Sequence, residues 1–245
     1  MIKSERMEQI LDILKIKKHA SVESLSKQVF VSPVTIRRDL RQMEQQGLVK
    51  RSYGGASLID YENKVVPLHL REEDMRSEKA MIAKQAVTRI REGDTVFLDA
   101  SSTVLRMTDY IPPKMRITVV TNSIKVVAAL CEKDIAVYCI GGKLINSSLA
   151  CVGPHAIQNV QSLNADVMFF SSQGLSACGD ITDFSESETH LRQTMLARAG
   201  KKIFLCDSGK LGKSFLFTIC NARDVDEVLS DKPIPESVFS SSGSF

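Results

Sequence analysis

The sequence contains no apolar run long enough to cross a membrane. A membrane-spanning helix needs roughly 18 consecutive apolar residues, and no stretch of the 245 residues approaches that length. Asp12 interrupts the apolar stretch near the start of the chain, where a secretion signal would need an unbroken apolar segment. We therefore expect no membrane segment, no secretion signal and a cytoplasmic location.

Paired cysteines are also absent. The six cysteines lie singly, without a Cys-x-x-Cys pair and mostly in apolar surroundings: Cys131, Cys139, Cys151, Cys178, Cys206 and Cys220. His155 and His190 have no Cys, His or Asp partner at the spacing of metal ligands. This pattern predicts reduced thiols, as in a cytosolic protein, and neither a metal site nor another cofactor.

Low-complexity sequence is scarce, but positive charge is concentrated at one end. A Ser-rich tail occupies residues 238–245, and the rest has the composition of an ordinary folded protein. Residues 1–57 carry 11 Lys and Arg against 6 Asp and Glu, whereas the other 188 residues carry 21 against 23. Because a local excess of cations is typical of polyanion-binding modules, we expect a small basic module joined to a neutral body.

The basic region has the pattern of three short helices. Apolar residues recur every three or four positions over residues 4–17, which predicts the first helix. Ser21 is a good N-cap for a second helix, and Ser32 followed by Pro33 begins a third that runs to about residue 46. Three short helices with a tight step before the third predict a helix-turn-helix.

The third predicted helix has an apolar face and a polar, cationic face. Ile36, Leu40 and Met43 point inward. The N-cap and the outer face carry Ser32, Val34, Thr35, Arg37, Arg38, Arg41 and Gln42. Guanidinium groups bind guanine edges or phosphates, small apolar groups contact the thymine methyl, and glutamine reaches adenine. This face therefore suits the major groove of DNA, and the alternative is a solvated charged surface.

A wing follows the third helix. Residues 48–57 contain a short strand, a Gly54-Gly55 turn and a second short strand. The predicted DNA contacts of the wing are Lys50, Arg51 and Tyr53, which would meet the sugar-phosphate backbone. A winged helix-turn-helix domain is favoured over a solvated charged surface because four features occur together: the apolar stripe, the basic face, the tight step and the wing.

The rest of the chain has an alternating α/β pattern. Residues 58–76 contain Pro67 and mixed charge and are predicted to be a linker, followed by a helix over residues 77–91. Short β-rich apolar segments then alternate with helical patterns. The predicted strands are 95–99, 117–121, 136–140, 167–170, 203–206 and 227–230. This alternation predicts an open, mainly parallel α/β sheet covered by helices.

Small polar residues follow five of these strands, where open α/β sheets bind ligands. The candidate ligand-binding residues are Asp99, Ser101, Ser102, Thr103, Thr121, Asn122, Ser123, Gly141, Gly142, Lys143, Gln173, Gly174, Asp207 and Lys210. Hydroxyls, amides and backbone N–H groups, with two lysines as countercharges, suit an anionic, hydroxyl-rich ligand such as a phosphorylated sugar. The alternative is that these residues cap the following helices.

Two sets of motifs carry a family resemblance. The N-terminal set is Arg6, Ile10, Leu14, Ser32-x-x-Thr35-Ile36-Arg37-Arg38-Asp39-Leu40 and Arg51-Ser52-Tyr53-Gly54-Gly55-Ala56. The second set is Asp99-x-Ser101-Ser102-Thr103, Thr121-Asn122-Ser123, Gly141-Gly142 with Gly153, and Asp207-Ser208-x-Lys210. Together they resemble the DeoR/GlpR family of bacterial transcriptional regulators over nearly the whole chain, although Tyr53 stands where a histidine is common. The resemblance implies a sugar-phosphate sensor domain similar in fold to ribose-5-phosphate isomerase.

That similarity raises the alternative of a sugar-phosphate isomerase with an accessory DNA-binding domain. Aldose–ketose isomerisation needs a carboxylate in the pocket to take a proton next to a carbonyl. The isomerases carry acids on the loop after a central strand, whereas residues 171–175 contain none. Many members of the DeoR/GlpR family also have an aspartate or similar polar group in that loop, so Gln173 leaves the identity of the ligand open. Glu186 and Glu188 lie at a predicted helix start, where acids stabilise the helix dipole. We therefore expect no enzymatic activity.

Residues and resemblance together predict a DNA-binding regulator, a repressor of carbohydrate-metabolism genes controlled by a phosphorylated sugar. Its expected partners are double-stranded operator DNA, the sugar and further copies of itself, because one winged helix contacts too few base pairs for genomic discrimination. The expected organisation is a DNA-binding domain at 1–57, a linker at 58–76, a sensor domain at 77–237 and a tail at 238–245.

The DNA-contact assignment predicts different effects for two substitutions. Arg38→Ala should relax the sequence preference of DNA binding, because a base-reading group is lost. Lys50→Ala should weaken binding to all DNA sequences alike and reduce the slope of log affinity against log salt concentration by about 1. Both effects are measurable as salt-dependent affinities for the chain's own promoter region and for a scrambled duplex. Unchanged DNA binding in both variants would show that the assignment is wrong.

Overall fold

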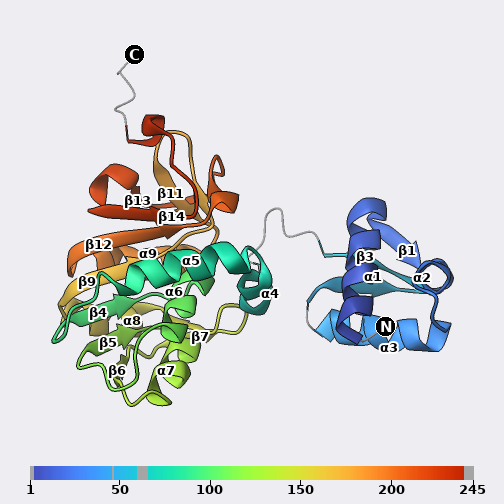
Figure 1. The fold of residues 1–245 in the computed structure, drawn as a ribbon, viewed down its shortest axis with the longest axis horizontal. Coiled ribbons are helices and arrows are strands. Elements are labelled where there is room, and N and C mark those ends of the chain that lie inside the picture. The colour runs from blue at the N-terminus through green and yellow to red at the C-terminus, as the bar shows by residue number, and fades with distance from the viewer. Residues whose placement is uncertain (1–2, 46, 60–65, 240–245) are drawn as a thin grey trace. The chain divides into compact units, whose positions relative to one another are not determined.

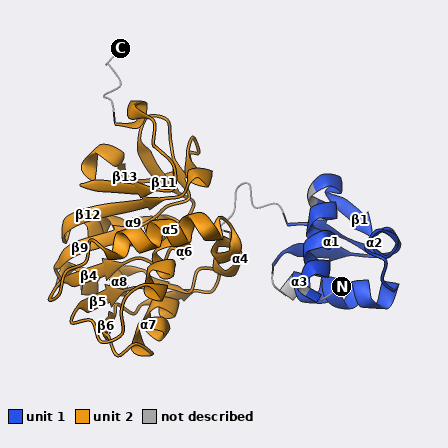
Figure 2. Ribbon diagram, in the orientation of Figure 1, with its two compact units in different colours: residues 1–64 blue, residues 65–245 orange. Residues whose placement is uncertain are grey.

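The computed structural model consists of two compact units, residues 1–64 and 65–245 (Figure 2). It describes residues 3–45, 47–59 and 66–239. Within these ranges no helix has both the length and the apolar composition that crossing a bilayer would require.

The first unit contains three helices and a three-stranded antiparallel sheet (Figure 1). Its elements are α1 (Lys3–Lys17), β1 (His19–Ser21), α2 (Val22–Val29), α3 (Pro33–Gln45), β2 (Val49–Ser52) and β3 (Gly55–Leu58). The three predicted helices and the two wing strands are confirmed. Strand β1 was not predicted, and it pairs with β3 to give the order β1-β3-β2.

Local sequence explains these boundaries. The Ser21 hydroxyl accepts a hydrogen bond from the Ser24 amide at 3.1 Å and begins α2, and the Ser32 hydroxyl accepts from the Thr35 amide at 3.3 Å at the start of α3. Gly55 is required by the close approach of β1, because a Cβ there would lie 2.5 Å from the Ala20 carbonyl oxygen. The wing is therefore fixed to the helices by a backbone contact that only glycine permits.

A buried ion pair joins α1 to α3. Arg6 donates from Nε to Asp39 Oδ2 at 2.6 Å and from Nη2 to Asp39 Oδ1 at 3.1 Å. Asp39 is fully buried, on the side of α3 whose Ile36, Leu40 and Met43 fill the core. The bidentate pair fixes the orientation of α3 relative to α1, since its planar geometry tolerates little rotation.

The second unit is built on a six-stranded parallel sheet. Its strands are β4 (Thr95–Leu98), β5 (Thr118–Thr121), β6 (Ala136–Cys139), β9 (Ala165–Phe170), β12 (Ala199–Cys206) and β14 (Glu227–Ser230). All six strands predicted from the sequence are confirmed. Their order is β14-β12-β9-β4-β5-β6, with every neighbouring pair parallel. The direction in which successive strands are added reverses between β4 and β9.

Helices cover both faces of this sheet. One core contains alternate strand residues such as Val96 and Leu98 together with α5 (Arg76–Val87), α6 (Ser102–Leu105) and α7 (Ile124–Cys131). The opposite core contains Phe97 and Phe170 together with α8 (Pro154–Gln161) and α9 (Glu186–Leu196). Side chains alternate between the two faces along each strand, so both faces of the sheet are apolar, as its sequence pattern indicates.

Two small sheets were not predicted. Strands β7 (Lys143–Ile145) and β8 (Ala150–Val152) form a hairpin. Strands β10 (Gly174–Leu175), β11 (Asp180–Asp183) and β13 (Phe217–Asn221) form an antiparallel sheet. The remaining elements are the short 3-10 helices η1 (Arg106–Asp109), η2 (Ser208–Lys210), η3 (Ala222–Asp224) and η4 (Glu236–Val238). These strands have two to five residues and most contain polar residues, as in β11 with Asp180 and Asp183, so they lack the apolar run that marked the strands of the main sheet.

The predicted linker, residues 58–76, was wrong over much of its length. Leu58 ends β3, and helix α4 (Leu68–Glu73) belongs to the second unit. A six-residue helix with one buried side chain, Leu68, is too short to show an apolar stripe in the sequence. Residues 60–65 of that linker and residues 240–245 of the predicted tail lie outside the described residues.

We expect Arg6→Ala to destabilise the first unit by about 2 kcal/mol, because it leaves the buried Asp39 carboxylate without its partner. Arg41→Ala, at an exposed position of the same helix, should change stability by less than about 0.5 kcal/mol. Hydrogen exchange of the α1 and α3 amides in the full chain measures both effects. Equal exchange rates in the two variants would rule out a stabilising role for the ion pair.

Candidate functional site

The predicted DNA-contacting residues form an exposed surface on α3 and the wing. Thr35 and Gln42 are half-buried, and the other predicted contacts are exposed, namely Ser32, Val34, Arg37, Arg38, Arg41, Lys50, Arg51 and Tyr53. Arg51 is held by Glu44, whose carboxylate accepts from the Arg51 amide at 3.0 Å and lies 3.7 Å from its guanidinium. The surface presents cations from both α3 and the wing, the two elements that a winged helix presents to a duplex.

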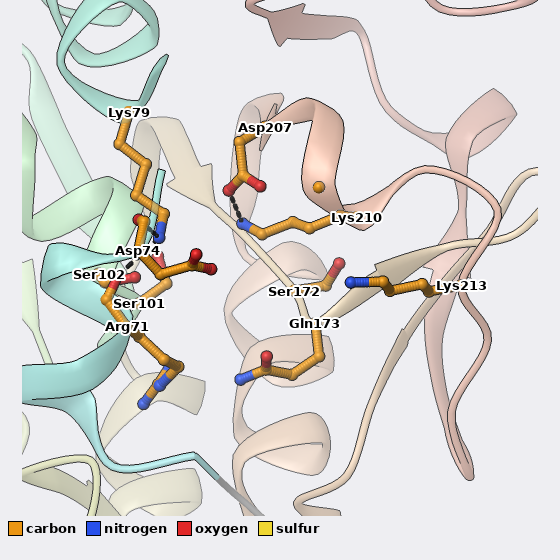
Figure 3. A pocket seen from close by; sticks show the side chains of 11 residues that line it. Arg71, Asp74, Lys79, Ser101, Ser102, Ser172, Gln173, Asp207, Lys210 and Lys213 are labelled. Atoms are coloured by element: carbon orange, nitrogen blue, oxygen red, sulfur yellow. Dashed lines mark hydrogen bonds and ion pairs between the residues drawn. The ribbon is translucent and has the colours of Figure 1, made fainter. Parts of the chain in front are cut away.

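A cavity lies in the second unit at the carboxyl ends of β4, β9 and β12. Its lining residues are Arg71, Asp74, Lys79, Ser101, Ser102, Ser172, Gln173, Asp207, Gly209, Lys210 and Lys213 (Figure 3). The position between β4 and β9 is the topological switch point, where open α/β sheets bind ligands. The volume of about 70 Å³ is small beside the roughly 300 Å³ or more of pockets for drug-sized molecules.

The cavity is lined by four cations and two carboxylates. Arg71 and Lys79 lie on the side of α4 and α5, and Lys210 and Lys213 lie on the side that follows β12. The two carboxylates belong to Asp74 and Asp207. The surplus of positive charge makes the cavity suitable for a small anion.

Lys79 has an unusual environment for a lysine. Burial lowers its pKa to about 8, with a further contribution from the charge of Lys210. Its ammonium group donates to the carbonyl oxygens of Arg71 at 2.6 Å and Asp74 at 2.5 Å. Lys79 therefore binds the last turn of α4 while lining the cavity.

Lys210 and Asp207 form an ion pair at the opposite wall. Lys210 Nζ lies 3.0 Å from Asp207 Oδ2 and donates to the hydroxyls of Thr103 at 3.1 Å and Ser171 at 2.6 Å. Burial alone would raise the pKa of Asp207, but the charge and hydrogen bond of Lys210 and the charge of Lys79 outweigh it and lower that pKa. Asp207 therefore stays ionised and is a weak proton acceptor.

Asp99, a predicted ligand contact, lies behind the cavity in a buried charge network. Arg192 Nε lies 2.8 Å from Asp99, its Nη1 3.1 Å from Asp183, and its Nη2 3.7 Å from Glu188. Asp99 also accepts from the amides of Ser101 at 3.0 Å and Ser171 at 3.2 Å. Asp99 thus positions the loops after β4 and β9 instead of lining the cavity.

The predicted contacts after β5 and β6 are not brought to the cavity either. Thr121, Asn122 and Ser123 are buried, and the Asn122 side chain donates to the Cys151 carbonyl of β8 at 3.2 Å. The Ser123 hydroxyl caps α7. The hairpin β7–β8, which was not predicted, therefore covers the carboxyl end of β5.

The remaining predicted contacts have structural explanations. Lys143 is exposed in β7. Gly142 has φ 113°, and a Cβ there would lie 2.6 Å from the Val152 carbonyl oxygen, so the hairpin requires glycine at this position. Gly141 lies in the same turn, also with positive φ, and Gly174 is buried in β10. The predicted contacts that line the cavity are Ser101, Ser102, Gln173, Asp207 and Lys210. Thr103 does not line it but accepts a hydrogen bond from Lys210.

Sequence reasoning missed the residues that α4 and α5 bring to the cavity. Arg71 and Asp74 were assigned to the linker, and Lys79 to the helix after it. A signal was available for Lys79, which precedes the buried Ile82 by three positions and Ala86 by seven, so it lies on the apolar stripe of α5. A lysine on such a stripe indicates a buried charge with a specific partner.

The low pKa of Lys79 predicts pH-dependent anion binding. Lys79 is charged at pH 7 and mostly neutral at pH 9, so sulfate, whose own charge is constant over this range, should bind up to about tenfold more weakly at pH 9. Isothermal titration calorimetry at matched ionic strength measures this change. Lys79→Met should remove most of the pH dependence, whereas Lys213→Met should lower the affinity but retain the dependence. A pH-independent sulfate affinity in the unsubstituted protein would contradict the assignment.

Several known proteins are similar in sequence to this chain over most of its length. GlpR of Haloferax volcanii is 32% identical over 94% of this chain and 91% of its own length. The L-fucose operon activator of Escherichia coli is 32% identical over 94% and 96%, respectively. The lactose phosphotransferase system repressor of Staphylococcus epidermidis is 31% identical over 94% and 93%.

Solved structures with a similar arrangement are more distant. Ribose 5-phosphate isomerase A of Methanocaldococcus jannaschii has a TM-score of 0.43 and 12% identity over 56% of this chain and 55% of its own. The sorbitol operon regulator SorC of Klebsiella pneumoniae has a TM-score of 0.43 and 10% identity over 95% and 97%, respectively.

Two family models divide the chain as its architecture does. The DeoR-like helix-turn-helix domain matches residues 6–62, and the DeoR C terminal sensor domain matches residues 74–232. The first match contains α3 and the wing, and the second contains the six-stranded sheet and most of the cavity lining. The chain therefore belongs to the DeoR family of transcriptional regulators.

Proposed function

We propose that this regulator represses genes of carbohydrate metabolism and that a phosphorylated sugar, bound in the cavity, controls its affinity for DNA. The observation that carries the proposal is the cationic cavity at the switch point of the sheet. The relatives named for an L-fucose operon and a lactose system support the class of genes, and the lactose relative, named as a repressor, has the proposed sign of regulation, whereas the L-fucose relative is named as an activator.

On the DNA side, the outer face of α3 enters the major groove and the wing contacts phosphates. Base contacts come from residues 34–42 of α3, and Lys50, Arg51 and Tyr53 contact the backbone. The protein binds as a homo-oligomer on paired half-sites, because a single winged helix reads too few base pairs. Light scattering of the operator complex measures this stoichiometry, and a monomer on operator DNA at micromolar concentration would contradict it.

On the effector side, the phosphate group binds among the four cations of the cavity. Lysine and arginine form short, charge-assisted hydrogen bonds with phosphate oxygens. Ser101, Ser102 and Gln173 offer hydroxyl and amide groups at the same cavity, and these suit the hydroxyls of a sugar. The small volume of the cavity favours the phosphate and its neighbouring carbons over a large ligand.

Catalysis is not part of this function. An isomerase needs a carboxylate that accepts a proton at neutral pH. Of the two carboxylates at the cavity, Asp207 is paired with Lys210 and has a lowered pKa. Asp74 follows α4 and does not lie on the loop after β9, which provides Ser172 and Gln173 at the cavity. Binding energy is therefore used to shift a conformational equilibrium and not to stabilise a transition state.

The experiment is a thermal-shift screen of the full chain against phosphorylated sugars and their unphosphorylated parents. A matching effector at 100 times its Kd should stabilise the protein by about 2.7 kcal/mol and lower its affinity for the promoter duplex, whereas the parent sugar should do neither. Lys213→Ala should weaken the effect, and Lys232→Ala, outside the cavity, should not. No stabilisation by any phosphorylated sugar would overturn the proposed effector class.

Two further experiments test the absence of catalysis and the sign of regulation. Interconversion of an aldose phosphate and a ketose phosphate by the purified protein would show that it is an enzyme. Deletion of the gene should raise expression of the sugar genes that the promoter duplex identifies, and lower expression would assign an activator.

A further inference from the structure

Helix α4 connects the cavity to the part of the chain that leads to the DNA-binding unit. It is the first helix of the second unit in chain order, and it contributes Arg71 to the cavity lining. Leu68 is the buried residue of this helix. Any force that acts on Arg71 therefore acts on the first helix of the second unit in chain order.

The guanidinium of Arg71 is incompletely satisfied. Its Nε donates to the Val66 carbonyl at 2.9 Å, but its Nη2 is buried and has no hydrogen-bond partner among the described residues. A buried charged donor without an acceptor costs free energy. Figure 3 shows Arg71 at the edge of the cavity, on the side opposite Lys213. An anion in the cavity would supply the missing acceptor.

Buried acids behind the cavity attract the positive charge of Arg71. Burial lowers its pKa, and this effect is opposed by the charges of Glu188, Asp183 and Asp99 in the network around Arg192. Those acids are fixed by their contacts with Arg192. A phosphate in the cavity adds a second attraction from the opposite side, so it changes the balance of forces on this side chain.

The second cation on this side of the cavity also acts on α4. Lys79 binds the carbonyl oxygens of Arg71 and Asp74, which are the groups left without intrahelical partners at the end of a helix. Two further contacts of α4 are polar. The Leu68 amide donates to the Ser147 carbonyl at 2.7 Å, and Glu72 pairs with Lys125 at 2.5 Å. A short helix held by polar contacts with one buried side chain is among the elements that open most easily.

We propose that α4 is the element through which effector occupancy reaches the DNA-binding unit, with Arg71 as the phosphate-binding residue that fixes it. This inference rests on the proposed function. With the cavity filled, the phosphate completes the hydrogen bonding of Arg71 and α4 is held against the sensor domain. With the cavity empty, Arg71 lacks that partner and α4 opens more often. Effector occupancy is thereby expressed as the stability of α4, the first helix of the second unit in chain order.

The primary experiment is hydrogen exchange of the full chain with and without inorganic phosphate, at ionic strength matched with chloride. Phosphate should slow exchange of the amides of residues 68–74 by fivefold or more. Arg71→Met should lose this protection even at phosphate concentrations that calorimetry shows to be saturating. Lys213→Met, which removes a cation from the other side of the same cavity, should bind phosphate more weakly but show full protection of α4 at saturation.

A second measurement links α4 to DNA binding. A typical allosteric coupling changes affinity by roughly 5- to 150-fold, and we expect phosphate or the active sugar phosphate to change promoter affinity within that range. In Arg71→Met the effector-induced change in promoter affinity should fall below about twofold.

The outcomes separate this inference from the proposed function. If calorimetry detects no binding of phosphate or of any sugar phosphate, the proposed effector site and the inference both fail. If phosphate binds and regulates DNA affinity but the α4 amides exchange at unchanged rates, or if Arg71→Met retains full regulation, only the role of α4 and Arg71 is overturned.

Discussion

A single buried arginine organises the sensor domain. Arg192 contacts Asp99 at the end of β4, Asp183 at the end of β11, and Glu188 in its own helix α9. Asp99 in turn binds amides of the loops after β4 and β9. Removing ions from water is costly unless every charge has a partner, so these segments are held in one arrangement. The two loops that flank the cavity are thus positioned by a contact that lies behind it.

The architecture was largely predictable because it follows from periodicity. All six strands of the main sheet were found as short apolar segments, since the inner strands of a parallel sheet are buried on both faces, although the edge strand β6 is mostly exposed. The helices of the first unit were marked by Ser21 and Ser32 at their starts. Strand β10 and helix α4, with two and six residues, were missed because their stability comes from contacts that are distant in sequence.

The site was predictable only in part. Polar residues at the carboxyl ends of strands were the correct class, but the sequence did not give the order of the strands. The loops after β4, β9 and β12 meet at the switch point, whereas those after β5 and β6 meet the hairpin β7–β8. Asp99 could not be separated from Ser101 by type or spacing, because its contact with Arg192 joins residues 93 positions apart.

The strand order also bears on how such regulators diverge. The cavity draws its lining from α4, α5 and the loops after three strands, while the apolar cores that hold the sheet together lie beneath them. Substitutions of lining residues outside these cores, such as Gln173 and Lys213, can therefore alter the charge and hydrogen-bonding groups of the cavity with little penalty to folding. Regulators with this fold can in this way change their ligand preference after gene duplication, while the apolar cores of the sheet stay the same.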